Sequence, residues 1–164
     1  RALLETLYST GIRRGEALKL TVFDVDLDRA TLRVKGKGRK ERLVPLGRQA
    51  VKFLGIYLKE ARPKLLPKLT AAPEALWLDR NRTGLGAAGL GHAIAKYARA
   101  AGLSTPANIH TLRRTCATAL LRNGAHPVVV AQLLGHADLN SLSHYLQTTI
   151  TDLLKAHSQS KPGQ

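Results

Sequence analysis

Two arginines and a histidine, His110, Arg113 and Arg114, lie within little more than one helical turn of each other. Helical spacing places them on the side opposite an apolar stripe that includes Cys116 and Leu120. Guanidinium groups stay charged, and their forked donors match two oxygens of an anion such as phosphate. The spacing therefore predicts an anion-binding group that projects away from the core. A solvated basic face would have the same pattern.

Another candidate arginine, which has an acidic neighbour, lies near the start of the chain. Arg13 stands where a loop leads into a predicted helix, and Glu16 follows within reach across one turn. A partly buried arginine needs an acidic or phosphate partner. The pair fits either an oriented anion ligand or an ordinary ion pair at the start of a helix.

A basic turn joins two predicted strands. Glycines flank Lys37, and Lys35, Arg39 and Lys40 stand close by. Glycine allows the backbone to turn tightly and to approach another chain closely. A lysine at such a tip suits insertion toward a nucleic-acid groove, and a solvated turn is the plain alternative.

The last group combines a histidine and a tyrosine. His136 follows Gly135, a predicted helix end, and Tyr145 lies on a short helix that Asp138 can cap. A phenolic oxygen can act as a nucleophile when it is activated. Taken alone, His136 could be a helix-end histidine, and Tyr145 could be a half-buried core tyrosine.

The elements that position these groups follow from periodicity. Residues 31–35 alternate with Leu32 and Val34 on one face, and residues 41–45 return as a second strand. Prolines 63 and 67 are expected to stop the third helix, and 76–78 could form a short strand. Leu90, Ile94, Tyr97 and Ala101 form the expected apolar stripe of another helix. Helices are predicted at 3–8, 14–20, 47–61, 86–101, 109–123, 127–135, near 145 and at 151–157. The fold class is mainly α with a small antiparallel β-sheet (α+β).

The charge balance narrows the class of partner. The 164 residues carry 26 Lys and Arg against 11 Asp and Glu, a formal net charge of +15. A surface field of this sign attracts a polyanion. A basic protein with no nucleic-acid role is the alternative that charge alone leaves open.

The remaining composition indicates one globular domain. Hydrophobic residues make up 44% of the chain, and the single cysteine, Cys116, can form no internal disulfide and is expected to be buried. No apolar run approaches the roughly 18 residues that cross a membrane. We expect a cytoplasmic, nucleoid-associated protein with no membrane partner and no small-molecule substrate.

Together these segments resemble the catalytic domain of the tyrosine recombinase or phage-integrase family, over essentially the whole chain. The matching segments are TGIRRGEAL, VKGKGRKERLVPLG, HTLRRTCATALL and LLGHADLNSLSHY. The family pattern of Arg, Lys, His-x-x-Arg, His and Tyr falls, in that order, on Arg13, Lys37, His110, Arg113, His136 and Tyr145.

The resemblance implies covalent strand exchange in DNA. Tyr145 would attack a scissile phosphate, form a 3′-phosphotyrosyl link and release a 5′-hydroxyl. Arg13 and Arg113 would clamp the phosphate, and His110 would accept the tyrosine proton. The other expected roles are general acid for Lys37, hydrogen-bond donor to the phosphate for His136 and orientation of Arg13 for Glu16. We expect no metal and no cofactor.

The same resemblance implies the partners and the domain limits. The substrate would be double-stranded DNA, bound by a homotetramer, with residues 1–157 as catalytic domain and 158–164 as a polar tail. An N-terminal core-binding domain is expected in the intact protein and is absent from these residues, so this chain alone should bind DNA weakly. Arg33, Lys35, Arg39, Lys40 and Arg114 are candidate contacts to the DNA backbone.

Two other functions remain open at this point. One is a DNA-binding module of the same fold without catalysis, and the other is DNA relaxation like that of a type IB topoisomerase. Trapping on a nicked substrate separates the first from a recombinase, and a plasmid relaxation assay tests the second. The target sequence and the biological role among integrases and resolvases cannot be predicted from these residues.

Overall fold

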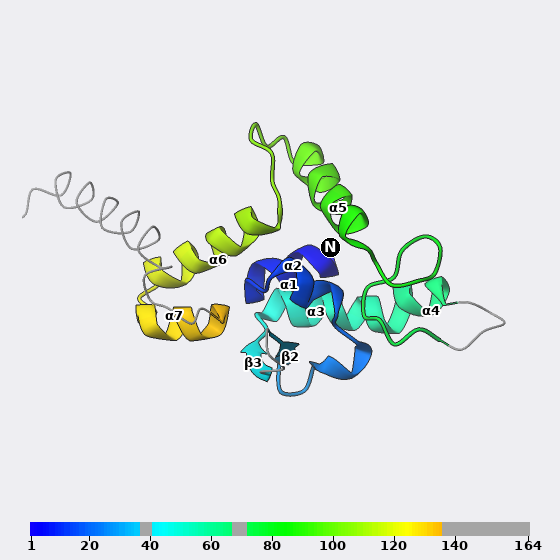
Figure 1. Cartoon of the computed structure of the whole chain (residues 1–164), viewed down its shortest axis with the longest axis horizontal. Helices are drawn as coiled ribbons and strands as arrows, with labels where there is room; N and C mark the ends of the chain where they lie inside the picture. Colours follow the sequence, from blue (N-terminus) through cyan, green and yellow to red (C-terminus); the bar gives the residue numbers. More distant parts are fainter. Residues whose placement is uncertain (37–40, 67–71, 136–164) are drawn as a thin grey trace, which may run out of the picture.

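One small sheet lies at the lower edge of a mostly helical chain (Figure 1). The computed structural model describes residues 1–36, 41–66 and 72–135. The mainly helical class with a small antiparallel sheet is confirmed. The α-helices are α1 (Ala2–Thr10), α2 (Arg14–Leu18), α3 (Arg48–Ile56), α4 (Arg62–Leu65), α5 (Ala87–Ala100), α6 (Ile109–Arg122) and α7 (Pro127–Leu134). A 3₁₀ turn η1 (Val22–Asp24) and a π turn η3 (Tyr57–Ala61) complete the helical elements.

The sheet is antiparallel, in the order β1 (Val25–Asp26), β2 (Thr31–Lys35) and β3 (Glu41–Pro45). Leu32 pairs with Val44, and both side chains are fully buried, as alternation requires when one face packs on the core. Both long strands match their predicted limits. β1 was not predicted, because two residues are too short to show a period, and 76–78 makes only an isolated bridge.

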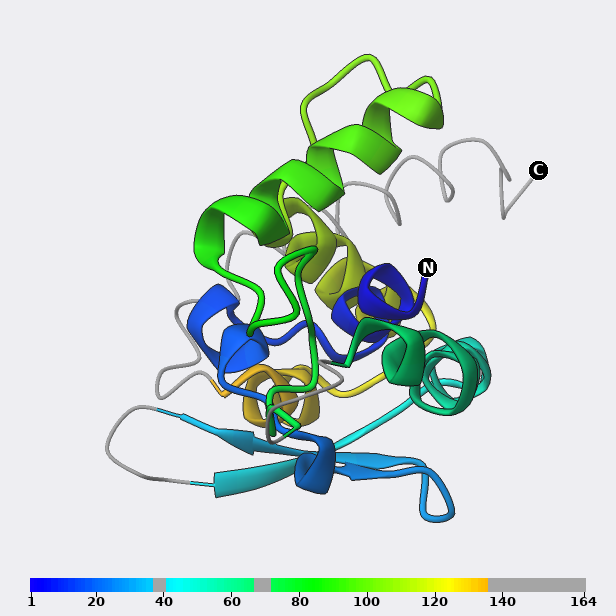
Figure 2. The same ribbon diagram turned by 90° about the vertical axis from the view of Figure 1, so that its right-hand side faces the viewer.

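The main core lies between the sheet and α1. Helix α1 packs against both α3 and α6, and its Leu7 joins Leu32 and Leu54 among the fully buried side chains. Figure 2 shows α7 beside the sheet, on the side where α1 and α6 lie. The start of α2, the first half of α6 and the end of α7 are thereby brought close together.

The third helix does not stop at Pro63, contrary to the prediction. Proline cannot donate to the carbonyl four residues earlier. The turn before it widens instead: the amide of Arg62 donates to the carbonyl oxygen of Tyr57, five residues back. The chain then continues as α4 as far as Leu65.

Helix α5 has a slightly different buried stripe from the one predicted. Leu90 and Ile94 are buried as expected, but the third buried residue is Ala98. Tyr97 is 48% exposed and Ala101 is exposed. The buried stripe therefore follows a spacing of four residues, from Leu90 through Ile94 to Ala98.

Several predictions concern residues outside the described ranges. These are the strand-joining turn with Lys37, Arg39 and Lys40, the segment with His136 and Tyr145, the two predicted C-terminal helices and the tail 158–164. Within the described ranges, no helix has the length and apolar character needed to cross a membrane.

Candidate active site

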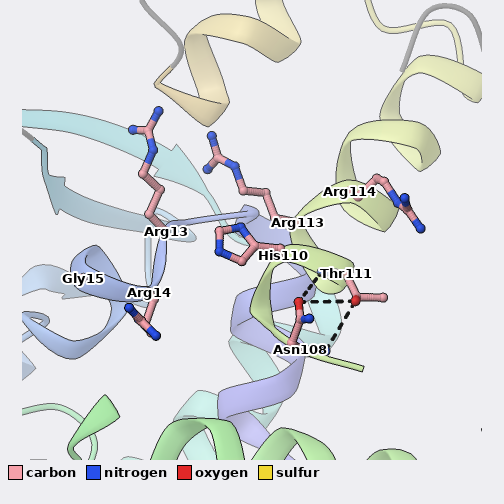
Figure 3. Close-up of a pocket in the computed structure, with 8 residues that line it drawn as sticks. All are labelled: Arg13, Arg14, Gly15, Asn108, His110, Thr111, Arg113 and Arg114. Carbon is pink, nitrogen blue, oxygen red and sulfur yellow. Dashed lines mark hydrogen bonds between the residues drawn. The ribbon is translucent and has the colours of Figure 1, made fainter. Parts of the chain in front are cut away.

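A basic pocket of about 670 Å³ lies where the start of α2 faces the start of α6 (Figure 3). It brings together residues that are about one hundred positions apart in the chain. Among the described residues, no acidic side chain lines it. The lining residues are Arg13, Arg14, Gly15, Asn108, His110, Thr111, Arg113 and Arg114.

Arg13 is the residue that caps the N-terminus of α2. Its Nη2 donates to the carbonyl oxygen of Gly135 at 2.8 Å, and its Nη1 lies 3.5 Å from Oε1 of Glu16. The side chain stays 45% exposed. These contacts fix the orientation of the Arg13 side chain, which also lines the pocket.

Arg113 is buried, which corrects the prediction that it projects away from the core. Its Nη1 donates to the carbonyl oxygen of Gly11, and its Nη2 donates to that of Leu134 at 2.7 Å. The buried stripe of α6 contains Ile109, Arg113, Cys116, Ala117 and Leu121. The two backbone carbonyl oxygens accept hydrogen bonds from the buried guanidinium of Arg113. These bonds fix the position of Arg113 at the wall of the pocket.

His110 and Arg114 are both exposed on α6 but point in different directions. In Figure 3 the ring of His110 points toward Arg13, whereas the side chain of Arg114 points away from His110 and Arg113. The prediction that Arg113 and Arg114 project together is thus wrong. Arg13, His110 and Arg113 form one group, and Arg114 lies at its edge.

Glu16 is the buried acidic partner of this group, with 6% of its side chain exposed. Its Oε2 accepts a hydrogen bond from the backbone amide of Arg13 at 2.8 Å. Arg42 donates to both carboxylate oxygens, at 2.9 and 3.0 Å. Burial by itself raises the pKa of Glu16, but the hydrogen bonds from Arg42 and Arg13 outweigh it, so the pKa lies below its ordinary value.

Three arginines from three elements bind the last carbonyls of α7. Arg42 of β3 donates through Nε to Leu133 at 3.0 Å, Arg113 of α6 donates to Leu134, and Arg13 donates to Gly135. Carbonyls at a helix C-terminus carry partial negative charge and lack partners within the helix. The end of α7, directly before His136 in sequence, is therefore fixed by two arginines that line the pocket, Arg13 and Arg113, and by Arg42, which lies outside it.

The chain also matches the model of a known protein family over most of its length. The model of the phage integrase family matches residues 1–151. The chain belongs to the phage integrase family.

Members of the phage integrase family are found among both curated and solved relatives. The tyrosine recombinase XerD of Staphylococcus epidermidis is 38% identical over 162 residues, 99% of this chain and 54% of XerD. The crystal structure of XerA recombinase matches 99% of this chain and 58% of its own, at 30% identity and a TM-score of 0.84. XerH site-specific recombinase, bound to its palindromic difH substrate, matches 96% of this chain and 44% of its own at 31% identity and a TM-score of 0.79. The chain thus spans about half the length of the curated relatives it matches.

Two candidate DNA contacts lie on β2 of this phage integrase domain, and they differ in how far they are engaged by other residues of the chain. Lys35 is exposed. Arg33 donates through Nε to Oδ1 of Asp24 at 3.1 Å, and its Nη2 lies 3.4 Å from the carbonyl oxygen of Phe23. Burial raises the pKa of Asp24, but hydrogen bonds from Thr21 and Arg33 outweigh it and lower the pKa. Arg33 is thus partly engaged within its own domain.

Arg42 was not among the predicted site residues, although the sequence contains a signal for it. In β3 a period of two places Arg42 on the same face as Val44, which is fully buried, while Leu43 points outward and is 69% exposed. A charged residue on the buried face of a strand needs a partner. Arg14, Asn108 and Thr111 were also missed, because nothing in their local pattern distinguishes them from ordinary residues at helix starts.

Cys116 is buried, as predicted, and its Sγ lies 3.6 Å from the carbonyl oxygen of Ser9. Burial raises its pKa to about 11. In the described ranges, no three His, Cys, Asp or Glu side chains gather in a way that could hold a metal ion.

Proposed function

We propose that this chain is the catalytic domain of a site-specific DNA recombinase that cleaves and rejoins DNA through a covalent 3′-phosphotyrosyl intermediate. The observation that carries the proposal is the meeting of Arg13, His110 and Arg113 at one basic pocket in a chain of the phage integrase family. Residues 1–157 would form this domain, and 158–164 would be its tail.

The pocket suits a phosphodiester in its transition state. Attack on phosphorus concentrates negative charge on the non-bridging oxygens, and Arg13 and Arg113 offer charged donors that are already oriented. Preorganised donors of this kind contribute on the order of 3 kcal/mol each. Glu16 pairs with Arg13 from outside the pocket, and the described residues that line the pocket include no acidic side chain.

The proposed reaction moves two protons. The phenolic oxygen of Tyr145 attacks phosphorus while the bond from phosphorus to the 5′-oxygen breaks. Tyrosine has an ordinary pKa of about 10, so its proton must be accepted, and His110 at the pocket is the proposed base. Lys37 would protonate the leaving 5′-oxygen, and His136 would donate a hydrogen bond to a non-bridging oxygen. A 5′-hydroxyl from a partner strand then reverses these steps.

The proposed partner is double-stranded DNA, bound as a homotetramer. Two observations support DNA as the partner: the net charge of +15 and the difH complex of the similar XerH. The tetramer and the additional N-terminal domain remain expectations from the family. They would supply the DNA grip that one catalytic domain provides only weakly.

The nucleophile can be tested without knowledge of the target sequence. Purified protein is incubated with a library of nicked duplexes of randomised sequence, which trap a covalent intermediate because the cleaved fragment diffuses away. We expect adducts that survive denaturation with the wild type and none with Tyr145→Phe, because phenylalanine lacks the attacking oxygen. Denaturing gels and sequencing of the attached DNA measure both.

Binding by Tyr145→Phe serves as the control and should stay within a few-fold of the wild type. Adducts with Tyr145→Phe would show that another residue attacks. No adduct with the wild type, together with retained binding, would favour a DNA-binding module without catalysis.

A further inference from the structure

We propose that Arg42 is a positioning residue for DNA cleavage, which holds Glu16 and the end of α7 and thereby orients Arg13 in the pocket. The inference rests on the proposed function and deepens it, because it adds a residue that lies outside the pocket. Arg42 is not among the pocket-lining residues.

All three nitrogens of the Arg42 guanidinium donate within the protein. Nη1 and Nη2 bind the two oxygens of Glu16 at 2.9 and 3.0 Å, and Nε binds the carbonyl oxygen of Leu133 at 3.0 Å. Its side chain is 19% exposed. Paired charged hydrogen bonds of this kind are strong and fix direction as well as distance. Arg42 is thus placed to orient neighbours, and a role as a DNA ligand would require these bonds to break.

The bonds form a closed ring that includes Arg13. Arg42 binds Glu16, and Glu16 accepts from the backbone amide of Arg13. Arg13 binds the carbonyl of Gly135, and Arg42 binds that of Leu133, two residues earlier in the chain. Loss of Arg42 would open the ring on two sides and, among the residues that the structure describes, leave Glu16 with Arg13 as its ion-pair partner.

The backbone at Gly135 fits closely around the same side chain. Gly135 has φ +67°, and a Cβ built there would lie 2.9 Å from Cζ of Arg42. Only glycine accepts both this conformation and this approach without strain. The end of α7 is therefore shaped around the guanidinium of Arg42, independently of the hydrogen bonds.

The position of Arg42 also relates it to the proposed general acid. Arg42 pairs with Val34 in the β2–β3 ladder, and these are the strands that the turn with Lys37 connects in sequence. One side chain thus ties the strands that carry this turn to both α2 and α7.

The test compares cleavage with binding. Single-turnover cleavage of a trapped substrate is measured at saturating DNA, and DNA affinity is measured separately by fluorescence anisotropy. For Arg42→Ala we expect cleavage to slow by about 100-fold, the loss that misplacement of a reacting group by roughly 1 Å produces. Affinity should change by less than about 3-fold, because Arg42 makes no proposed DNA contact.

Chemical rescue distinguishes positioning from general loss of structure. Ethylguanidinium can occupy the space left by Arg42→Ala and pair with Glu16. We expect it to restore cleavage by at least about 10-fold in Arg42→Ala, and to leave Tyr145→Phe inactive. Arg42→Lys keeps the charge but lacks the fork, so it should cleave more slowly than the wild type.

Two controls guard against misfolding and unspecific charge loss. Circular dichroism fixes a temperature at which every variant is folded, and rates are compared there. Arg29→Ala removes an arginine that is 85% exposed and should cleave like the wild type. Wild-type cleavage by folded Arg42→Ala, or a loss of cleavage that binding fully explains, would overturn the inference. Absence of cleavage by the wild type would instead count against the proposed function.

Discussion

Glu16 shows how a carboxylate can serve a site that is built to bind an anion. It is buried beside Arg13 and Arg42 and balances charge that would otherwise repel within the protein. Its carboxylate oxygens are turned toward those two arginines and the amide of Arg13, so it does not line the pocket. Burial of a paired carboxylate thus leaves the field inside the pocket positive.

The lowered pKa of Glu16 predicts how stability depends on pH. A carboxyl group whose folded pKa is depressed adds stability that is fully present above its ordinary pKa of 4.5 and is lost as the pH falls through the folded value. Glu16→Gln should therefore be less stable than the wild type at neutral pH. The difference should shrink as the pH falls below the ordinary value of 4.5 and through the lowered pKa of Glu16.

Thermal unfolding followed by circular dichroism at several pH values measures this difference. Glu5→Gln, which removes an ion pair with the exposed Arg1, is the matched control for the loss of one carboxylate. A constant gap between wild type and Glu16→Gln at every pH would contradict the prediction.

At the scale of elements, the turn between α1 and α2 passes close to α6 and α7. Gly11 has φ +58° there, and a Cβ on it would lie 2.6 Å from Cδ2 of Leu134 and 3.3 Å from Sγ of Cys116. Its carbonyl oxygen accepts the hydrogen bond from Arg113. The turn thus contacts α6 and α7 beside the buried guanidinium of Arg113.

Gly11→Ala should be destabilising for two separate reasons. The left-handed conformation costs an alanine roughly 1 kcal/mol, and overpacking against Leu134 adds roughly 1–3 kcal/mol. Gly124→Ala is the control, because Gly124 has φ +84° but no neighbour within 4 Å of its Cβ position. Urea unfolding of both variants measures the difference.

The difference between these variants should equal the steric part alone. Equal losses of stability in Gly11→Ala and Gly124→Ala would show that the Leu134 side chain moves aside at no cost, and would contradict the steric part of the prediction.

The elements that the sequence predicts well are those with a strong local period. The alternation of 31–35 and the glycine after α7 both matched, because a strand face and a helix end are local properties. The burial of Arg113 could not be predicted in this way. Its partners are the carbonyls of Gly11 and Leu134, distant backbone atoms that no helical period reveals.

At the scale of the whole molecule, segments far apart in the chain form the pocket. The family resemblance predicted that Arg13, His110 and Arg113 act together, and the structure brings them to one pocket. Lys37, His136 and Tyr145 lie outside the described ranges, so their places in the site stay predictions.

The net charge of +15 predicts strongly salt-dependent DNA binding. Each phosphate neutralised by Lys or Arg releases counterions, so affinity should fall at least about 100-fold between roughly 50 and 200 mM salt, which corresponds to about four phosphate contacts. Fluorescence anisotropy with duplex DNA over a salt series gives the slope. Affinity that changes less than about 3-fold over this range would argue against the backbone contacts proposed here.

The hydrogen bonds that hold the end of α7 determine which substitutions the site can tolerate. The acceptors at Leu133, Leu134 and Gly135 are main-chain oxygens, which every amino acid possesses. Exposed positions of α7 such as Val129 can therefore vary without removing a single acceptor. The same freedom does not extend to the three donors, whose forked side chains no other residue type reproduces. Substitutions should thus be tolerated at the exposed positions of α7 and should be damaging at Arg13, Arg42 and Arg113.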